Sequence, residues 1–129
     1  MKPMQNLQFD HYTIKVTDLE VSAEFYTSVL GLQEITNRTK KTHIRWFSLG
    51  QGELHIVEGK VPEIQTNIGV HLALKLKDFD QFLSHLDENS VIAHDSKANP
   101  QKITTRADGV RQVYFKDPDD YWIEVNDAS

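Results

Sequence analysis

Residues 11–26, HYTIKVTDLEVSAEFY, return in altered form as residues 71–86, HLALKLKDFDQFLSHL. Each stretch begins with a histidine and has an aspartate seven residues later, and the two histidines are 60 residues apart. The matching positions are His11/His71, Ile14/Leu74, Lys15/Lys75, Val16/Leu76, Asp18/Asp78, Leu19/Phe79 and Glu20/Asp80. Because repeated units bury their apolar faces together, this repeat predicts a domain made of two copies of one supersecondary unit.

Length and composition predict an ordinary globular domain. The chain has 129 residues, of which 39% are hydrophobic and 26% are charged, and this suits a single hydrophobic core. There is no cysteine, so histidine and carboxylate must supply the protein ligands of any metal.

Charge and hydropathy disfavour two classes of partner. The net charge is −5, and Lys and Arg are scattered apart from a short patch at Arg38, Lys40, Lys41 and Arg45, so we expect no nucleic-acid partner. No segment approaches the length of a membrane span, and the first residues lack the apolar run of a secretory signal. We therefore expect no membrane contact and a cytoplasmic location.

The first copy has the pattern of strand, helix and three strands. Residues 11–16 alternate between apolar and polar, which predicts a strand. A helix follows, with Asp18 at its N-cap and Gly31 just beyond its end. Three strands are then expected at about 32–37, 43–49 and 53–58, since Gly50 and Gly52 mark a turn between the last two.

The second copy repeats this order. It is expected to have a strand at 70–76, a helix capped by Asp78, and strands near 91–94, 110–116 and 121–126. Residues 96–109 show neither helical nor strand periodicity and are interpreted as a long loop, and loops of this length in compact domains often serve as lids over a site. Residues 59–69 form the linker between the copies. The prediction is one domain over residues 1–129, with βαβββ modules at about 7–60 and 67–127.

Four candidate ligands occupy the polar side of predicted strands. His11 and His71 open the two copies, and His55 and Glu124 lie on the last strand of each copy with apolar neighbours on the other side. Imidazole and carboxylate from separate strands suit Zn, Ni, Mn or Fe and leave coordination positions open to substrate. Glu53 shares a face with His55 and competes with it as a ligand; His55 is preferred because it is more central in its strand.

The motifs of the chain resemble a known superfamily. The segments DHYTIKVTDLEVSAEFYTSVLGL (10–32), GVHLALKLKDF (69–79) and GVRQVYFKDPDDYWIEV (109–125) are similar to the vicinal oxygen chelate superfamily. This superfamily includes glyoxalase I, methylmalonyl-CoA epimerase, fosfomycin thiol transferases, extradiol dioxygenases and bleomycin-binding proteins. The resemblance implies an α+β fold in which paired βαβββ modules form a cupped, eight-stranded mixed sheet with helices outside.

The resemblance also implies a metal site. The family's ligand positions fall on His11, His55, His71 and Glu124, and the expected cofactor is a divalent ion: Zn, Ni, Mn or Fe. Glyoxalase-like chemistry on a small molecule with two neighbouring oxygens would use Glu124 as the catalytic base. The expected assembly is a homodimer, in which the modules pair either within one chain or across the dimer. Glyoxalase I itself presents a glutamate where this chain has His55.

Three other functions are compatible with the resemblance. An Fe(II) extradiol-type dioxygenase would use His11, His71 and Glu124 as its triad, with Tyr114 ten residues before the glutamate. A metal-free drug-binding or resistance protein is disfavoured, because all four ligand positions are kept. A fosfomycin thiol transferase is ranked low, because only five residues follow Glu124.

Overall fold

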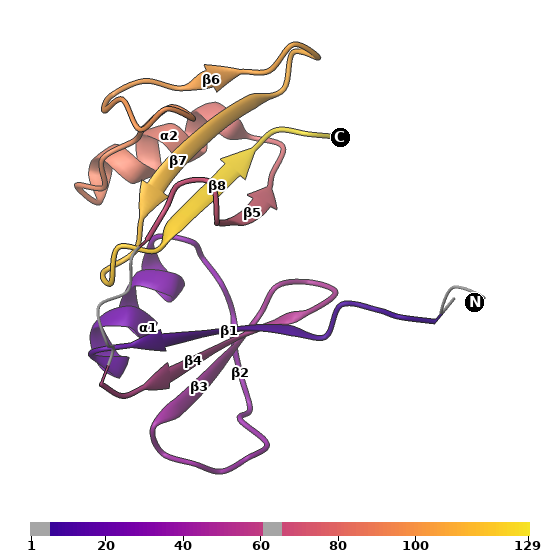
Figure 1. The fold of residues 1–129 in the computed structure, drawn as a ribbon, viewed down its shortest axis with the longest axis vertical. Helices are drawn as coiled ribbons and strands as arrows, with labels where there is room; N and C mark the ends of the chain where they lie inside the picture. The colour runs from indigo at the N-terminus through magenta and orange to yellow at the C-terminus, as the bar shows by residue number, and fades with distance from the viewer. Residues whose placement is uncertain (1–5, 61–65) are drawn as a thin grey trace. The chain divides into compact units, whose positions relative to one another are not determined.

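A computed structural model of the chain describes residues 6–60 and 66–129, and in those residues it shows two helices and eight strands (Figure 1). The chain divides into two compact units, unit 1 (Met1–Pro62) and unit 2 (Glu63–Ser129). The boundary falls in the predicted linker, of which residues 61–65 lie outside the described part. Among the described residues, no helix is long and apolar enough to cross a membrane.

Unit 1 contains one helix and a four-stranded mixed sheet. Its elements are β1 (His11–Val16), α1 (Leu19–Ser28), β2 (Glu34–Ile35), β3 (Ile44–Ser48) and β4 (Glu53–Glu58). The strand order is β1-β4-β3-β2. β1 and β4 are parallel, whereas β3 is antiparallel to both of its neighbours.

Unit 2 has the same connectivity. Its elements are β5 (Leu72–Lys75), α2 (Phe79–Glu88), β6 (Thr104–Thr105), β7 (Arg111–Lys116) and β8 (Trp122–Asn126). The strand order is β5-β8-β7-β6, again with the first and last strands parallel and adjacent. The α+β class and the repeated βαβββ unit are thus confirmed, as one four-stranded sheet in each unit.

The aspartates that mark the repeat are helix caps. A carboxylate oxygen of Asp18 accepts a hydrogen bond from the backbone N–H of Val21 at 3.1 Å, and Asp78 accepts one from Gln81 at 3.1 Å. Each bond satisfies an N–H group that has no partner inside the helix. Gly31, with φ of +66°, adopts the left-handed conformation expected after α1.

The edge of the unit 2 sheet differs from the prediction. Residues 91–94 do not form a strand; only His94 bridges to Tyr114 and to Pro100. The short strand β6 lies inside residues 96–109, which were predicted to be a loop. Two short pieces therefore line β7, with residues 95–103 looping out between them, and neither piece is long enough to show a period of two.

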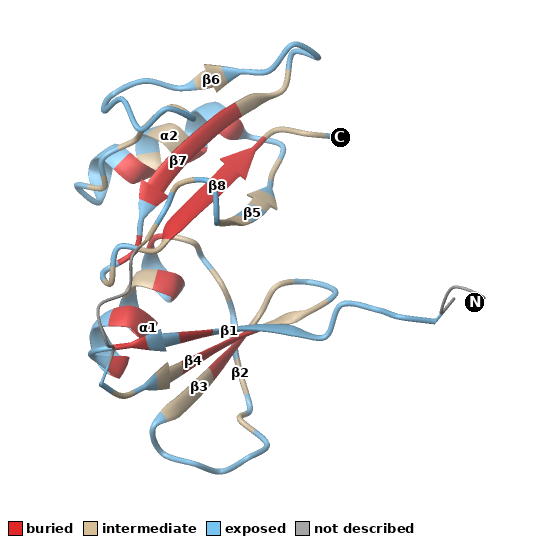
Figure 2. Cartoon of the chain, viewed as in Figure 1, coloured by how far each residue is buried: buried red, intermediate tan, exposed pale blue. Residues whose placement is uncertain are grey.

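Each sheet has an apolar face that packs under its helix and an opposite face that we call the polar face. Figure 2 shows buried residues along most of β7 and β8. The apolar faces carry buried residues that alternate with the predicted site residues. They are Ile14, Val16, Phe47, Leu54 and Ile56 in unit 1, and Val113, Phe115, Ile123 and Val125 in unit 2. The rings of Phe82 on α2 and Phe115 on β7 lie 5.8 Å apart, so α2 packs on the apolar face of its sheet.

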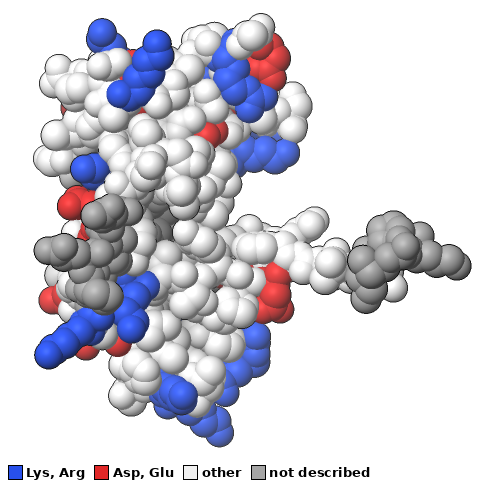
Figure 3. All heavy atoms as spheres, in the orientation of Figure 1, with Lys and Arg blue, Asp and Glu red and all other residues white. Residues whose placement is uncertain are grey.

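The short basic patch of unit 1 is partly neutralised. Arg45 forms ion pairs with Glu34 at 2.7 Å and Glu20 at 3.3 Å, and Arg38 lies 3.4 Å from Glu53. On the face drawn in Figure 3, the Lys and Arg side chains are dispersed, with carboxylates among them. The face drawn there shows no continuous basic stripe of the kind that binds nucleic acid.

Candidate metal site

Strand register gives His55 and Glu124 the same place in the two units. On the parallel pair β1 and β4, Thr13 is opposite His55; on β5 and β8, Ala73 is opposite Glu124. Thr13 and Ala73 are 60 residues apart and so hold the same position in the repeat. Glu53, the competing candidate ligand, lies on β4 two residues before this shared position.

The candidate ligands are brought together in pairs, one pair in each unit. His11 lies beside His55, with ring centroids 4.2 Å apart, and His71 Nε2 lies 3.1 Å from Glu124 Oε1. The repeat therefore places two potential ligands at one place on each polar face. Convergence of all four side chains on a single ion stays a prediction.

The unit 2 pair has the geometry of two adjacent metal ligands. His71 Nδ1 lies 2.6 Å from the carbonyl oxygen of Ile68, which can only accept, so Nδ1 carries a proton. Nε2 then faces the Glu124 carboxylate, and either a second proton or a cation must lie between these two acceptors. Donor atoms about 2.1 Å from a common ion lie roughly 3.0–3.4 Å apart, which matches the observed 3.1 Å. An N–H···O=C contact of this kind is a common way to orient a metal-binding histidine.

Three donors hold the Glu124 carboxylate in place. Oε2 accepts from Gln112 Nε2 at 3.1 Å and from Asn126 Nδ2 at 2.6 Å, and Oε1 accepts from the Tyr114 hydroxyl at 2.9 Å. Burial raises the pKa of Glu124, but the hydrogen bonds from Asn126, Gln112 and Tyr114, together with His71, outweigh burial and bring the pKa below its usual value. Glu124 is therefore an ionised carboxylate with a fixed orientation.

The same contact affects Tyr114. Burial, reinforced by the hydrogen bond to Glu124 and by the charge of that carboxylate, raises the pKa of Tyr114 to about 12. The tyrosine ring also meets the His71 ring edge-on, with centroids 5.2 Å apart. Tyr114 is thus a neutral donor that touches both members of the unit 2 pair.

Replacing Tyr114 by Phe should change the response of stability to alkaline pH. The folded-state pKa lies above the ordinary value of 10, so the stabilisation is complete below pH 10 and is lost as pH rises toward 12. Wild type should lose about 2 kcal/mol more unfolding free energy than Tyr114→Phe over this interval. Urea unfolding at pH 9, 10.5 and 12 measures this loss, with Tyr12→Phe on β1 as control. Identical pH profiles for wild type and Tyr114→Phe would contradict the assignment.

The unit 1 pair belongs to a stack of rings. The His55 ring lies between the Trp46 ring, at 3.9 Å and 5°, and the His11 ring, at 4.2 Å and 15°. The Arg38 guanidinium lies over the other side of Trp46, 4.4 Å from the ring centre. The strand pairing explains this order, because Trp46 on β3 is directly opposite His55, and β1 flanks β4 on its other side.

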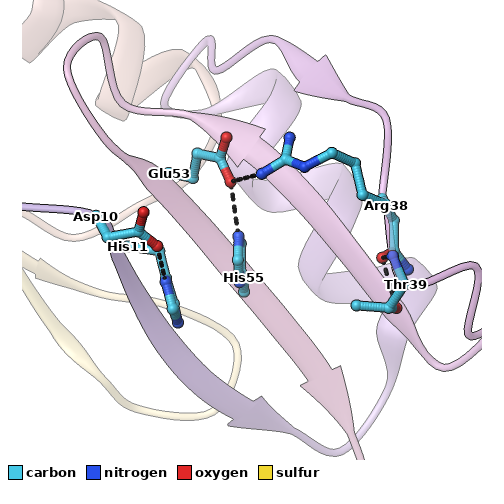
Figure 4. A network of polar contacts seen from close by, with 7 residues as sticks. Asp10, His11, Arg38, Thr39, Glu53 and His55 are labelled. Atoms are coloured by element: carbon cyan, nitrogen blue, oxygen red, sulfur yellow. Dashed lines mark hydrogen bonds and ion pairs between the residues drawn. The ribbon is translucent and has the colours of Figure 1, made fainter.

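Each histidine of the stack also has a carboxylate partner (Figure 4). His11 Nδ1 pairs with Asp10, and His55 Nε2 lies 2.9 Å from Glu53 Oε1. Hydrogen bonds from the imidazoles lower the pKa of both carboxyl groups, so both are ionised. Glu53 thus contacts His55 and Arg38 and has the position of an orienting partner.

The stacked rings of His11 and His55 are not oriented to bind one ion together. An ion bound by imidazole lies near the ring plane, about 2.0–2.1 Å from nitrogen, and two nearly parallel planes this far apart share no such point. Binding one ion through both rings requires at least one ring to turn; His11 is the more exposed, at 41% of its side chain against 11% for His55. Within residues 6–60 and 66–129, no three His, Asp or Glu side chains are already assembled around a possible ion. His71 and Glu124 have both the residue types and the spacing of metal ligands. His11 and His55 have the residue types of metal ligands, but their rings are stacked.

The prediction from sequence missed two of the donors around Glu124, Gln112 and Asn126, and named Tyr114 only for the dioxygenase alternative. Gln112 is directly opposite Asn126, and Tyr114 is directly opposite Glu124, all on the polar face of β7 and β8. The signal was present as polar residues alternating with buried Val113, Val125 and their neighbours. Two adjacent strands with such alternation predict a polar network, once their register is known.

Comparison with known proteins agrees with this architecture. Residues 8–125 match the Glyoxalase/Bleomycin resistance protein/Dioxygenase superfamily. A probable lactoylglutathione lyase of Vibrio parahaemolyticus is 29% identical over 128 residues, covering 95% of this chain and 91% of the relative. The metallothiol transferase FosB of Staphylococcus epidermidis is 26% identical over 127 residues, covering 95% and 83%.

Solved structures share the fold. The oxidase ChaP-H2 superposes with a TM-score of 0.80 at 21% identity, covering 97% of this chain and 96% of the other. A putative glyoxalase family protein from Bacillus anthracis gives 0.76 at 23% identity, covering 99% and 100%. The family match extends over both βαβββ units and includes all four candidate ligands, so the chain belongs to the glyoxalase, bleomycin resistance protein and dioxygenase superfamily.

Proposed function

We propose that this protein is a divalent-metal-dependent lyase or isomerase of the glyoxalase kind, acting on a small metabolite with two neighbouring oxygens. His11, His55, His71 and Glu124 would hold the ion, which is Zn, Ni, Mn or Fe. The observation that carries the proposal is the unit 2 pair. His71 Nε2 and Glu124 Oε1 are 3.1 Å apart, while the Nδ1 proton of His71 is engaged by a backbone carbonyl.

Within this reaction Glu124 would also be the base. When bound, the ion would supply Lewis acidity toward the two substrate oxygens and so raise the acidity of a neighbouring C–H group. The lowered pKa of Glu124 makes it a weak base, so this role requires a substrate proton of raised acidity.

Metal content should separate His55 from Glu53 as the unit 1 ligand. We expect His55→Ala to lose the stoichiometric ion, because it removes a metal–nitrogen bond. Glu53→Gln should keep the ion and bind it about 10- to 100-fold more weakly, as orienting partners do. Elemental analysis of untagged protein and competition with a chelating dye measure both quantities. The assignment is reversed if Glu53→Gln is the variant that loses its ion.

A panel of substrates shows which class of reaction the protein catalyses. Metal-loaded protein should convert a hemithioacetal of methylglyoxal, and it should not consume O₂ with catechol and Fe(II). The dioxygenase is the second candidate, and the Tyr114 hydroxyl 2.9 Å from Glu124 is the observation that favours it. Fosfomycin with a thiol belongs in the same panel because one relative is a metallothiol transferase. Activity only with catechol or only with fosfomycin would replace the glyoxalase proposal.

We also propose a homodimer. β1 and β5 each pair with a single neighbour in their own sheets, and a strand edge left in this way favours pairing or exchange between chains. Light scattering at micromolar concentration should report a dimer, and a monomer alone would refute it. The cytoplasmic location stays a prediction.

A further inference from the structure

His94 lies in line with Glu124 across the unit 2 sheet. Its backbone N–H donates to Tyr114 O at 2.7 Å, and the N–H of Tyr114 donates to His94 O at 2.9 Å. Tyr114 is in turn directly opposite Glu124 on β8. Directly opposite residues of antiparallel strands project to the same side of a sheet. The three side chains therefore occupy one row on the polar face.

The His94 ring has an unusual environment. It meets the Trp122 ring edge-on, with centroids 5.1 Å apart and planes at 86°. Nδ1 of His94 is the one side-chain nitrogen or oxygen in residues 6–60 and 66–129 that is buried without a hydrogen-bond partner. The residue as a whole is only half-buried. Nε2 is therefore the ring nitrogen of His94 that can form a hydrogen bond with water or a ligand.

The buried nitrogen decides where the proton lies. A proton on Nδ1 would be an N–H donor buried without an acceptor, and such orphaned donors are rare. A proton on Nε2 can meet water or a ligand instead. Neutral His94 therefore presents an N–H donor on the same face as Glu124 and His71.

We infer that His94 is a substrate-binding residue whose Nε2–H donates a hydrogen bond to a substrate oxygen. The inference rests on the proposed function of the polar face and narrows its substrate class. The metabolite carries an acceptor oxygen, such as a carboxylate or carbonyl, in addition to the two neighbouring oxygens that bind the ion. The Trp122 ring beside His94 would give this part of the substrate an apolar neighbour.

Two chelating probes test this role on zinc-loaded protein. Oxalate has outward-facing oxygens beyond the two that chelate, whereas catechol has only carbon there. In calorimetric titrations, His94→Leu should bind oxalate about 5- to 100-fold more weakly than wild type and catechol equally well. His94→Gln, whose amide nitrogen can stand in for Nε2, should recover most of the oxalate affinity. His85→Leu on α2 is the matched control and should change neither probe.

The outcomes separate this inference from the proposed function. Unchanged oxalate affinity in His94→Leu, or equal losses of oxalate and catechol, would overturn it. Failure of wild type to take up zinc would instead refute the metal proposal. In that case ¹⁵N-edited NMR of the imidazoles still decides for His94, since a proton on Nδ1 rather than Nε2 overturns the donor role.

Discussion

Replacing Glu124 by Gln is expected to lower turnover by at least about 100-fold while reducing metal content far less, because the amide keeps one oxygen ligand but cannot accept a proton. The structure adds a second effect. When the Gln oxygen takes the Oε1 position and stays a ligand, its NH₂ group faces the side-chain amides of Gln112 and Asn126, which donate to Oε2 of Glu124. A donor facing a donor should lower the unfolding free energy by about 1–3 kcal/mol.

The measurement takes turnover, metal content and urea unfolding from one preparation of each variant. Glu88→Gln, an exposed glutamate on α2, is the control and should leave all three unchanged. Full activity of Glu124→Gln on a substrate that wild type converts would exclude Glu124 as the base. Loss of metal in proportion to activity would show that Glu124 acts as a ligand alone.

Divalent metal is expected to stabilise the folded protein, and His71→Leu should remove the effect. A ligand at 100 to 1,000 times its dissociation constant adds about 2.7–4.1 kcal/mol to the unfolding free energy. His71→Leu deletes the nitrogen that faces Glu124 and leaves a carboxylate without its partner ligand. The stabilisation should also fade at low pH, because protons compete with the ion for imidazole and carboxylate.

Thermal unfolding with Zn, Ni, Mn or Fe(II), before and after EDTA, measures this stabilisation. His85→Leu changes a histidine of the same unit away from the pair and should respond to metal as wild type does. An equal metal-induced shift in His71→Leu would remove His71 from the ligand set. Absence of a shift with all four ions in wild type would refute the metal site as a whole.

Local signals were enough to predict the fold. Each capping aspartate bonds to a backbone N–H three residues further on, so the start of each helix is a local property of the sequence. The 60-residue repeat shows that the same order of elements occurs twice, and the two βαβββ units therefore follow from sequence alone. The edge beside β7 did not follow. His94 and residues 104–105 join that edge through hydrogen bonds to residues distant in the chain, and neither piece carries a local period.

Sequence by itself determined which face of each strand the candidate ligands occupy, because alternation along a strand is a local property. Tertiary structure decided their partners: the register that makes His55 the counterpart of Glu124, the ring stack beside His55, and the three donors around Glu124. It also decided that His94, which belongs to no motif in the sequence, lies opposite Tyr114 with its Nδ1 buried. These features depend on which strands become neighbours and how far each slides along the next, and such pairings join residues far apart in the chain.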